Sequence, residues 1–312
     1  MTETYVVTGG AGFIGSHIAD HLLRQGHRVR IVDNFTTGKR DNLSTLTGEL
    51  EIFEISITDK DALDKAFVGA DYVFHQAALP SVPRSVADPL TTNEMNVTGT
   101  LNVLLAARDA GVKRVAYAAS SSAYGDVDAE YKTEDLTPDP ISPYAVAKLA
   151  GEFYCKSFTQ VYGLETVALR YFNVFGPRQD ETSQYSAVIP KFIAAMSKGQ
   201  SPTVHGDGTQ SRDFTFIDNV VHGNLLAIKA PEASGEMMNM ATGGRISLLD
   251  LIEKINTVLG TNIEPTFTES RKGDVKHSRA GIDKARDLLD FSPVVDFDTG
   301  LARTIDWFLK RG

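Results

Sequence analysis

Closely spaced glycines near the start of the chain constrain its fold more than any other feature. Segment 4–8 predicts a short buried strand, and segment 13–24 has the apolar spacing of an amphipathic helix. Gly9, Gly12 and Gly15 join the two. Positions without a Cβ permit a tight turn, let pyrophosphate oxygens reach backbone N–H groups and allow close packing of helix on strand. The pattern predicts a dinucleotide-binding turn at a helix N-terminus, although the glycines alone also fit an ordinary turn.

An acidic residue follows at the distance that such a turn requires. The next predicted strand, 28–32, ends at Asp33. A carboxylate there accepts hydrogen bonds from the hydroxyls of an adenosine ribose and repels a 2′-phosphate, so NAD is favoured over NADP. Lys39 and Arg40 are close in sequence and would favour the phosphate, which leaves NADP as the alternative.

Strand and helix patterns alternate through the first half of the chain. Further strands are predicted at 52–55, 72–75, 112–119 and 165–169. This alternation predicts an α/β fold, a Rossmann-type doubly wound parallel sheet with a smaller C-terminal substrate-binding lobe. We expect an NAD-binding domain over residues 1–172 and the lobe over 173–312, with segments such as 214–228 returning to the first domain.

Composition excludes several classes of protein. The 312 residues are 42% hydrophobic and 23% charged, which is enough for a large core. The first predicted strand begins almost at the first residue, and no apolar run approaches the roughly 18 residues of a membrane span. We therefore expect a cytoplasmic protein without a membrane partner. A formal charge of -9 argues against a nucleic-acid surface, and a single cysteine, Cys155, excludes an intramolecular disulfide.

A tyrosine and a lysine form the candidate reactive pair. Ser142 suits an N-cap and Pro143 the first helical position, so Tyr144 and Lys148, four residues apart, share one face of a helix. A phenol with an ordinary pKa near 10 is a poor base at neutral pH. A nearby ammonium group and a positively charged nicotinamide would stabilise the phenolate. In isolation, the pair also fits a half-buried aromatic ring and a solvated lysine.

Three hydroxyl groups complete the pattern. Ser120, Ser121 and Ser122 follow an apolar strand, at the sheet edge where open α/β proteins bind ligands. The glycine turn, these serines, Tyr144 and Lys148 occur in the order that is typical of the extended short-chain dehydrogenase/reductase family, which the chain resembles over essentially its whole length. Within that family it is most similar to UDP-sugar 4-epimerases, and especially to those acting on UDP-N-acetylglucosamine.

The resemblance implies a catalytic set and a cofactor site. Ser120, Tyr144 and Lys148 would be catalytic. NAD would be bound by Gly9, Gly12, Phe13, Ile14, Gly15, Asp33, Asn34, Thr37, Gly38, Ile57, Gln76, Ala77, Ala78, Asn96, Tyr144, Lys148 and Tyr171. The family usually has an aspartate before the apolar residue that contacts adenine, whereas here Ser56 stands there, so Asp59 is an alternative contact.

The resemblance also implies a UDP-sugar site. Its residues would be Ser81, Arg84, Ser121, Ser122, Asn173, Ala187, Val188, Lys191, Phe192, Thr203, His205, Arg212, Arg271, Asp274 and Ser278. The guanidinium groups of Arg212 and Arg271 suit bidentate contacts to a diphosphate. Thr203 replaces the aromatic residue that often stacks on uracil in this family. The loop carrying Ser81 and Arg84 fits an ordinary proline-rich surface loop almost equally well.

The implied reaction passes through a transient 4-keto sugar and leaves the cofactor unchanged overall. Related dehydratases and decarboxylases have acidic residues where this chain has Ser121 and Ser122, so the acid and base for elimination are missing. Epimerases restricted to non-acetylated sugars have a tyrosine where this chain has Ser278, and a serine leaves room for an N-acetyl group.

Alternatives remain open from sequence. The chain could be a UDP-glucose 4-epimerase without activity on acetyl-sugars, a nucleotide-sugar dehydrogenase or reductase with exchangeable NAD, or a non-catalytic NAD sensor. His17 and His21 lack a third ligand, so no metal is predicted. The apolar rows at 101–107 and 153–158 fit core or, by the resemblance, the surface of a homodimer.

Overall fold

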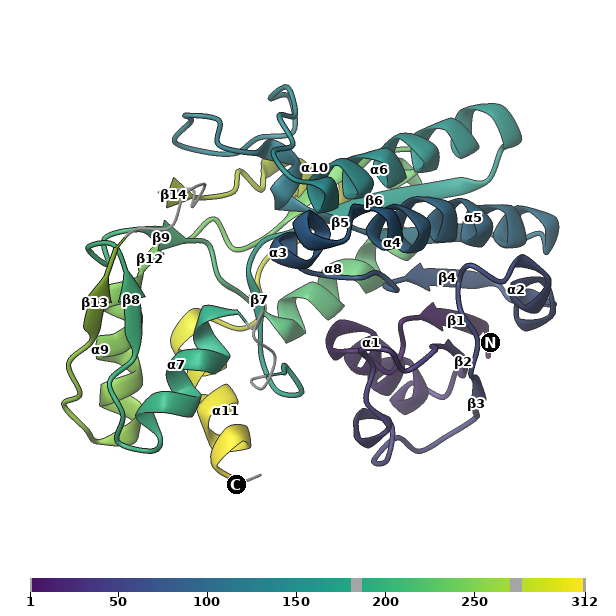
Figure 1. The fold of residues 1–312 in the computed structure, drawn as a ribbon. Helices are drawn as coiled ribbons and strands as arrows, with labels where there is room; N and C mark the ends of the chain where they lie inside the picture. The colour runs from purple at the N-terminus through teal and green to yellow at the C-terminus, as the bar shows by residue number, and fades with distance from the viewer. Residues whose placement is uncertain (1, 181–186, 270–276, 311–312) are drawn as a thin grey trace.

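A parallel sheet organises the chain. The computed structural model describes residues 2–180, 187–269 and 277–310. Within them, seven parallel strands pair in the order β11-β6-β5-β4-β1-β2-β3 (Figure 1). Their bounds are β1 (Thr4–Thr8), β2 (Arg28–Val32), β3 (Leu50–Phe53), β4 (Tyr72–His75), β5 (Arg114–Ser120), β6 (Glu165–Tyr171) and β11 (Met237–Met240). The order reverses between β1 and β4, where open α/β sheets bind their ligands.

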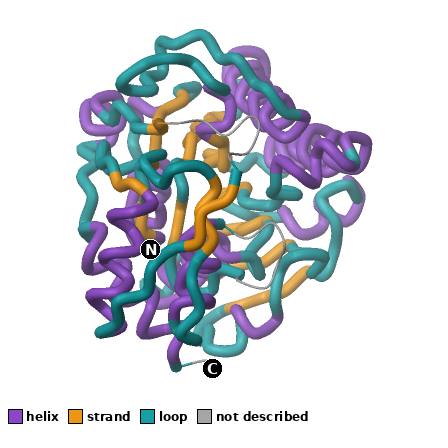
Figure 2. The backbone as a smooth tube through the Cα atoms, turned by 60° about the vertical axis from the view of Figure 1, so that its left-hand side comes forward, coloured by secondary structure: helices purple, strands orange, loops and turns teal. Residues whose placement is uncertain are grey.

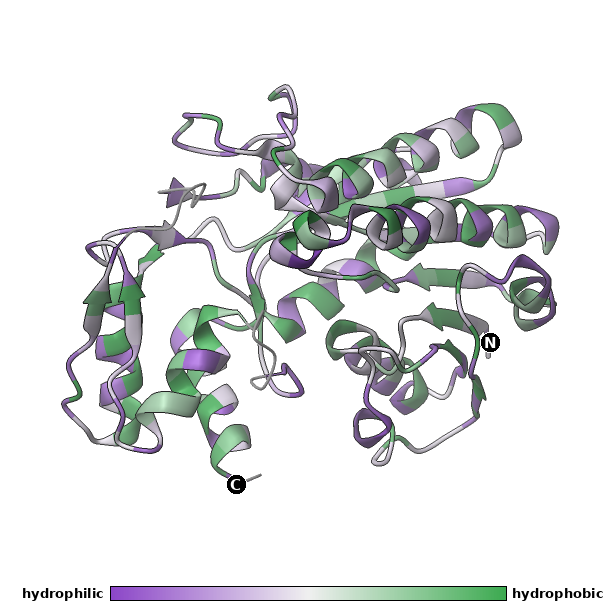
Figure 3. Ribbon diagram, viewed as in Figure 1, coloured by the Kyte–Doolittle hydropathy of each residue, from purple (hydrophilic) through white to green (hydrophobic). Residues whose placement is uncertain are grey.

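Helices cover both faces of the sheet, which is why its strands are apolar along most of their length (Figure 3). One face packs against α1 (Phe13–Arg24) and α8 (Ile217–Lys229). The other packs against α2 (Lys60–Phe67), α5 (Gly99–Asp109) and α6 (Pro143–Tyr162). No helix in the described part of the chain is long and apolar enough to cross a membrane. The predicted doubly wound α/β fold is confirmed.

Several boundaries differ from those predicted. Strand β3 lies at 50–53 rather than 52–55, because it is an edge strand whose only pairing is with β2 and whose side chains are largely solvent-accessible. Strand β5 begins at Arg114, since the N–H of Val112 bonds to the carbonyl of Ala107 and closes the preceding helix. Strand β6 continues to Tyr171, which pairs with both of its neighbours.

The remaining elements surround the sheet or form the lobe on the left of Figure 1. Helices α3 (Val82–Ala87) and α4 (Pro89–Asn93) follow β4, and α10 (Asp283–Leu289) lies near β11. The lobe contains α7 (Val188–Met196), α9 (Leu248–Leu259), α11 (Phe297–Leu309), β8 (Thr203–His205) and β13 (Thr266–Thr268). Short strands link it to the sheet: β7 (Val174–Phe175), β9 (Ser211–Arg212), β10 (Thr215–Phe216), β12 (Ile246–Ser247) and β14 (His277–Ser278).

The second half of the chain does not form the lobe alone. Helix α8 packs against α1 and β5, and β11 is an edge strand of the main sheet. Figure 2 shows the strands in orange between groups of purple helices. The chain therefore enters the lobe, returns to the sheet at α8 and β11, and leaves it again. The division at residue 172 stays a prediction.

A buried histidine beneath the sheet edge makes stability depend on pH. His75 is 1% exposed, and its ring nitrogens lie 2.7 Å from Thr8 Oγ1 and 3.0 Å from Thr100 Oγ1. Burial, followed by the charge of Lys148, lowers the pKa of His75 to about 3. Between this pKa and the ordinary value near 6.5, the unfolded chain binds more protons than the folded one. The free energy of unfolding therefore falls as the pH is lowered through this window.

We expect His75→Asn to flatten this dependence. Between pH 7.5 and pH 5, the wild-type protein should lose about 2 kcal/mol more unfolding free energy than the variant, because only the wild type keeps an imidazole neutral at this site. Urea unfolding at the two pH values measures the difference. The buried His17 is unchanged in both proteins, so its contribution cancels. Equal losses would contradict the assignment.

Candidate active site

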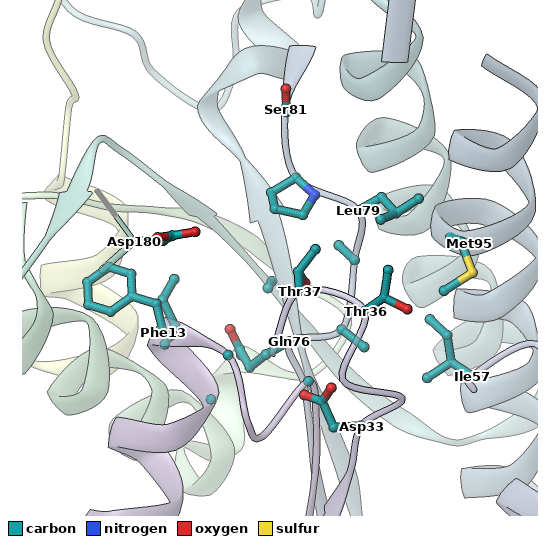
Figure 4. A pocket seen from close by; sticks show the side chains of 18 of the residues that line it. Phe13, Asp33, Thr36, Thr37, Ile57, Gln76, Leu79, Ser81, Met95 and Asp180 are labelled. Carbon is teal, nitrogen blue, oxygen red and sulfur yellow. The ribbon is translucent and has the colours of Figure 1, made fainter. Parts of the chain in front are cut away.

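A cavity of about 440 Å³ opens at the carboxyl ends of the strands, where their order reverses (Figure 4). It is lined by most of the residues predicted to bind NAD: Gly9, Gly12, Phe13, Ile14, Gly15, Asp33, Asn34, Thr37, Ile57, Gln76, Ala77, Ala78, Tyr144, Lys148 and Tyr171. Ser81 and Arg84, predicted to contact the sugar, also line it. Gly38 and Asn96 stand just behind the wall.

The backbone of the glycine turn has no room for a side chain at Gly9 or Gly15. Gly9 has a φ of +67°, and a Cβ added to it would lie 2.7 Å from the backbone nitrogen of Ala77. A Cβ on Gly15 would lie 2.3 Å from the carbonyl oxygen of Gly9. Helix α1 begins at Phe13 with Gly12 as its N-cap, and no side chain caps it. The open turn and the uncapped helix N-terminus fit a pyrophosphate.

Asp33 is held at the floor of the cavity. Its carboxylate accepts hydrogen bonds from the backbone N–H groups of Ala11 at 2.9 Å and Phe35 at 2.8 Å. Burial raises the pKa of Asp33, and these two N–H groups oppose the rise. Gly38 lies against the carboxylate, since a Cβ there would approach Asp33 Oδ1 to 2.6 Å. The carboxylate is therefore held in place on the cavity wall, and its contact with ribose hydroxyls stays a prediction.

The two basic residues that favoured NADP are paired with carboxylates. Lys39 Nζ lies 2.9 Å from Asp180, and Arg40 Nη2 lies 2.6 Å from Glu54. Their charges are partly balanced before any phosphate approaches, which supports NAD.

The part of the cavity around Ile57, predicted to take the adenine, is apolar, with Ile55 and Met95 also on the cavity wall. Asp59, the alternative contact, instead caps α2 by accepting the N–H of Ala62 at 3.0 Å, so its carboxylate serves the helix. Asn96 also acts at a distance. It bonds to the N–H and the carbonyl of Leu79, at 2.7 and 3.1 Å, and so fixes the loop that follows β4.

A loop that the sequence did not identify closes the rim above α1. The carbonyl of Pro177 lies 2.9 Å from His17 Nε2, and Arg178 Nη2 lies 3.1 Å from Asp20. Arg178 and Asp180 line the cavity. The only sequence signal for this loop was the Gly-Pro pair at its start.

His17, considered above as a metal ligand, has a structural partner in the Pro177 carbonyl, and burial lowers the pKa of His17 to about 4. The described residues contain no group of three or more possible metal ligands.

Tyr144 and Lys148 lie together on the wall of the cavity, on the first turns of α6. Ser142 caps this helix and Pro143 begins it, as predicted. Lys148 is buried; its Nζ donates to the carbonyl of Ala118 at 2.7 Å. Burial lowers the pKa of Lys148 to about 8. This lysine can therefore change charge near neutral pH.

Ser120, Ser121 and Ser122 form a turn at the end of β5, the serine turn, which brings the Ser120 hydroxyl to Tyr144. Burial raises the pKa of Tyr144, and a hydrogen bond with Ser120 lowers it. Ser120 Oγ also accepts hydrogen bonds from Ser122, from its N–H at 3.2 Å and from its hydroxyl at 2.9 Å. Among the protein's own groups, burial has the larger effect on Tyr144. Its phenolate therefore needs further positive charge, which an oxidised nicotinamide ring supplies when bound.

A second cavity, of about 290 Å³, lies at the junction with the lobe. Predicted substrate residues line it: Asn173, Ala187, Val188, Phe192, Thr203, His205 and Arg212. Ala187 lines both cavities, so the two adjoin. Lys191 and Ser278 lie beside it: Lys191 on α7, and Ser278 on β14, in register with Arg212. Ser121 and Ser122 stay in the serine turn, and Arg271 and Asp274 fall outside the described residues.

Residues 5–241 match the family described as "NAD dependent epimerase/dehydratase family". This chain belongs to that family. The resemblance noted from its sequence is therefore confirmed. The match covers the main sheet from Tyr5 in β1 to the end of β11, together with the serine turn and the Tyr144/Lys148 helix.

Relatives in this epimerase/dehydratase family match the chain from end to end. A structure of UDP-N-acetylglucosamine 4-epimerase from Methanobrevibacter ruminantium, in complex with UDP-N-acetylmuramic acid, is 42% identical, covers 100% of both chains and has a TM-score of 0.96. A putative UDP-glucose 4-epimerase from Methanocaldococcus jannaschii is 37% identical over 97% of both chains. UDP-glucose 4-epimerase from Thermus thermophilus, in complex with NAD, is 35% identical over 98% of this chain and 99% of its own, with a TM-score of 0.89.

Proposed function

We propose that this protein is an NAD-dependent UDP-sugar 4-epimerase, an isomerase that interconverts UDP-GlcNAc and UDP-GalNAc. UDP-glucose and UDP-galactose are also substrates, because a pocket that admits an acetyl group admits the smaller sugar. The proposal rests chiefly on one observation. Tyr144 and Lys148 line the cofactor cavity, Ser120 bonds to Tyr144, and this cavity adjoins a second one in the lobe.

Each part of the cofactor cavity has a role in this reaction. The glycine turn and the N-terminus of α1 would hold the pyrophosphate of NAD, and Asp33 the adenosine ribose. NAD held there would supply the acceptor, and then the donor, of the hydride at C4 of the sugar. Tyr144 removes the proton from the 4-hydroxyl and gives it back, while Ser120 orients that oxygen. Lys148 keeps positive charge beside the phenolate.

The second cavity fits the nucleotide part of the substrate. Arg212 offers a guanidinium group for the diphosphate, with Asn173 and His205 on the same wall. Ser121 and Ser122 provide neither the acid nor the base that elimination requires, so the 4-keto sugar is reduced again rather than dehydrated.

We expect the purified protein to form UDP-GalNAc from UDP-GlcNAc without added cofactor, because NAD stays bound between the two hydride transfers. Anion-exchange chromatography or proton NMR of the products measures this. Tyr144→Phe should keep its NAD and lose about a thousandfold in kcat, since the general base is gone. Failure to convert UDP-GlcNAc or UDP-glucose, even with NAD added, contradicts the function. Net production of NADH would support a dehydrogenase instead.

The choice of sugar is proposed to depend on Ser278. It lies on β14, in register with Arg212 on β9, and is only partly exposed. We expect Ser278→Tyr to reduce turnover of UDP-GlcNAc by at least about a hundredfold and to spare UDP-glucose, because the ring would occupy the space for the acetyl group. Ser278→Ala is the control, and it should use both sugars. Equal losses on the two substrates would exclude this gatekeeper role.

We also propose that the protein is a cytoplasmic homodimer, paired through α5 and α6. On α6, Phe153 is 62% exposed and Val146 is 52% exposed. Leu101 and Leu105 on α5 are only partly buried, and the two helices contact each other. An apolar face shared by two adjacent helices fits a symmetric interface with a second copy of the chain.

Light scattering should give twice the 33.9 kDa mass of one chain. Phe153→Glu should yield monomers with unchanged secondary structure, because it places a charge at the centre of the proposed interface. Val258→Glu, at an exposed position of α9 in the lobe, is the matched control and should stay dimeric. A monomeric wild-type protein would overturn the dimer.

A further inference from the structure

A buried ion pair lies beneath the catalytic residues. Arg170, on β6, bonds to Glu152, on α6, through Nε–Oε1 at 2.9 Å and Nη2–Oε2 at 2.7 Å. The two side chains are only 1% and 6% exposed. A buried ion pair often stabilises a fold no better than apolar residues of the same volume, because desolvation opposes the attraction. Its position beside the helix that carries Tyr144 and Lys148 points to a role beyond stability.

Glu152 faces the catalytic lysine. It follows Lys148 by four residues on α6, so the two side chains are neighbours on one helix face. The carboxylate raises the pKa of Lys148, against the larger lowering effect of burial. Arg170 and Lys148 in turn lower the pKa of Glu152, which burial raises. The three residues form an alternating row of charges, with Glu152 between two cations.

Other groups around Lys148 do not replace this carboxylate. On α6 it meets Tyr144 and Cys155, and burial raises the pKa of both. On β5, the ring of Tyr117 lies 5.0 Å from Nζ, and burial also raises the pKa of Tyr117. On β4, His75 stays neutral. Glu152 is therefore the one group in the described part of the chain that acts on Lys148 as an anion at neutral pH.

Arg170 also reaches the serine turn. Its guanidinium lies 4.4 Å above the ring of Tyr124, the last residue of the short helix η3 (Ser121–Tyr124). The Tyr124 hydroxyl donates to Asn239 Oδ1 at 2.7 Å. Arg170 thus contacts both the helix that carries Lys148 and the turn that carries Ser120. These are the two elements whose relative position the reaction depends on.

We propose that Glu152 and Arg170 are positioning residues of the reaction: Glu152 keeps Lys148 positively charged, and Arg170 fixes Glu152 and the serine turn in place. This inference rests on the proposed 4-epimerase function. A neutral Lys148 would no longer stabilise the Tyr144 phenolate, so loss of the Glu152 charge should act most strongly at alkaline pH. A purely structural role would instead reduce activity equally at every pH.

The test compares the pH profiles of kcat for UDP-GlcNAc. The alkaline limb of the profile is the fall of kcat as Lys148 loses its proton. In Glu152→Gln, the midpoint of this limb should shift to a pH lower by about one unit or more, because a neighbouring carboxylate is lost. The loss should be about tenfold near pH 8.5 and small near pH 6.5, with KM within about twofold of the wild type. Glu152→Leu/Arg170→Met removes both charges without leaving either unpaired, and should show the same shift. Glu152→Asp should restore the limb.

A second ion pair, which also involves β6, provides a matched control. Arg114 on β5 bonds to Glu165 on β6 at 2.9 and 2.6 Å, at the strand ends remote from the site. Arg114→Met/Glu165→Leu should lower Tm and leave the alkaline limb unchanged. A limb that does not move in Glu152→Gln, or losses that are equal at all pH values, would overturn the proposal.

One measurement separates this inference from the proposed function. The ¹³Cε signal of Lys148, assigned with Lys148→Arg in protein labelled at lysine, reports its pKa without turnover. A lower pKa in Glu152→Gln supports the charge effect even if wild-type protein converts neither sugar, whereas an unchanged pKa overturns it. Wild-type turnover by itself tests the 4-epimerase function.

Discussion

The contact between two glycines fixes the position of α1, and with it the site. Because Gly15 packs against the carbonyl of Gly9, the helix begins immediately beyond the end of β1, with its uncapped N–H groups facing the cavity. Any side chain at Gly15 would push the helix away from the strand. The parallel sheet then brings Asp33 and the loop after β4 to the same edge. A phosphate site, a ribose site and a catalytic wall therefore follow from one close approach.

Polar groups beneath the site are buried in pairs or networks. His75 is enclosed by two threonine hydroxyls, Asp33 by backbone N–H groups and Glu152 by Arg170. Each arrangement opposes the cost of burying a polar group near a reacting centre. The charge of Lys148 is consequently set by groups behind the cavity as well as by those that line it.

The sequence predicted the central elements well and the long-range contacts poorly. Strands β1, β2 and β4 and helix α1 have the predicted bounds, because burial on both faces makes apolar runs coincide with pairing. β3 was displaced, since an edge strand lacks that signal. The glycines, Asp33, Tyr144 and Lys148 could be singled out from sequence because their spacing is local, and the structure brings them to one cavity. The contact of Pro177 with His17 joins residues 160 positions apart, and no local pattern encodes it. The Glu152–Arg170 pair likewise depends on how a helix and a strand face each other.

Two segments far apart in the sequence meet at the rim of the cofactor cavity. Lys39 comes from the loop after β2, and Asp180 from the segment that leads into the lobe. Their ion pair, with the contacts of the same segment to α1, bridges the mouth of the cavity. A dinucleotide bound there would lie against the same polypeptide that leads into the lobe. The cofactor cavity and the lobe therefore share a stretch of polypeptide, and a change in this segment would be felt on both sides of the junction.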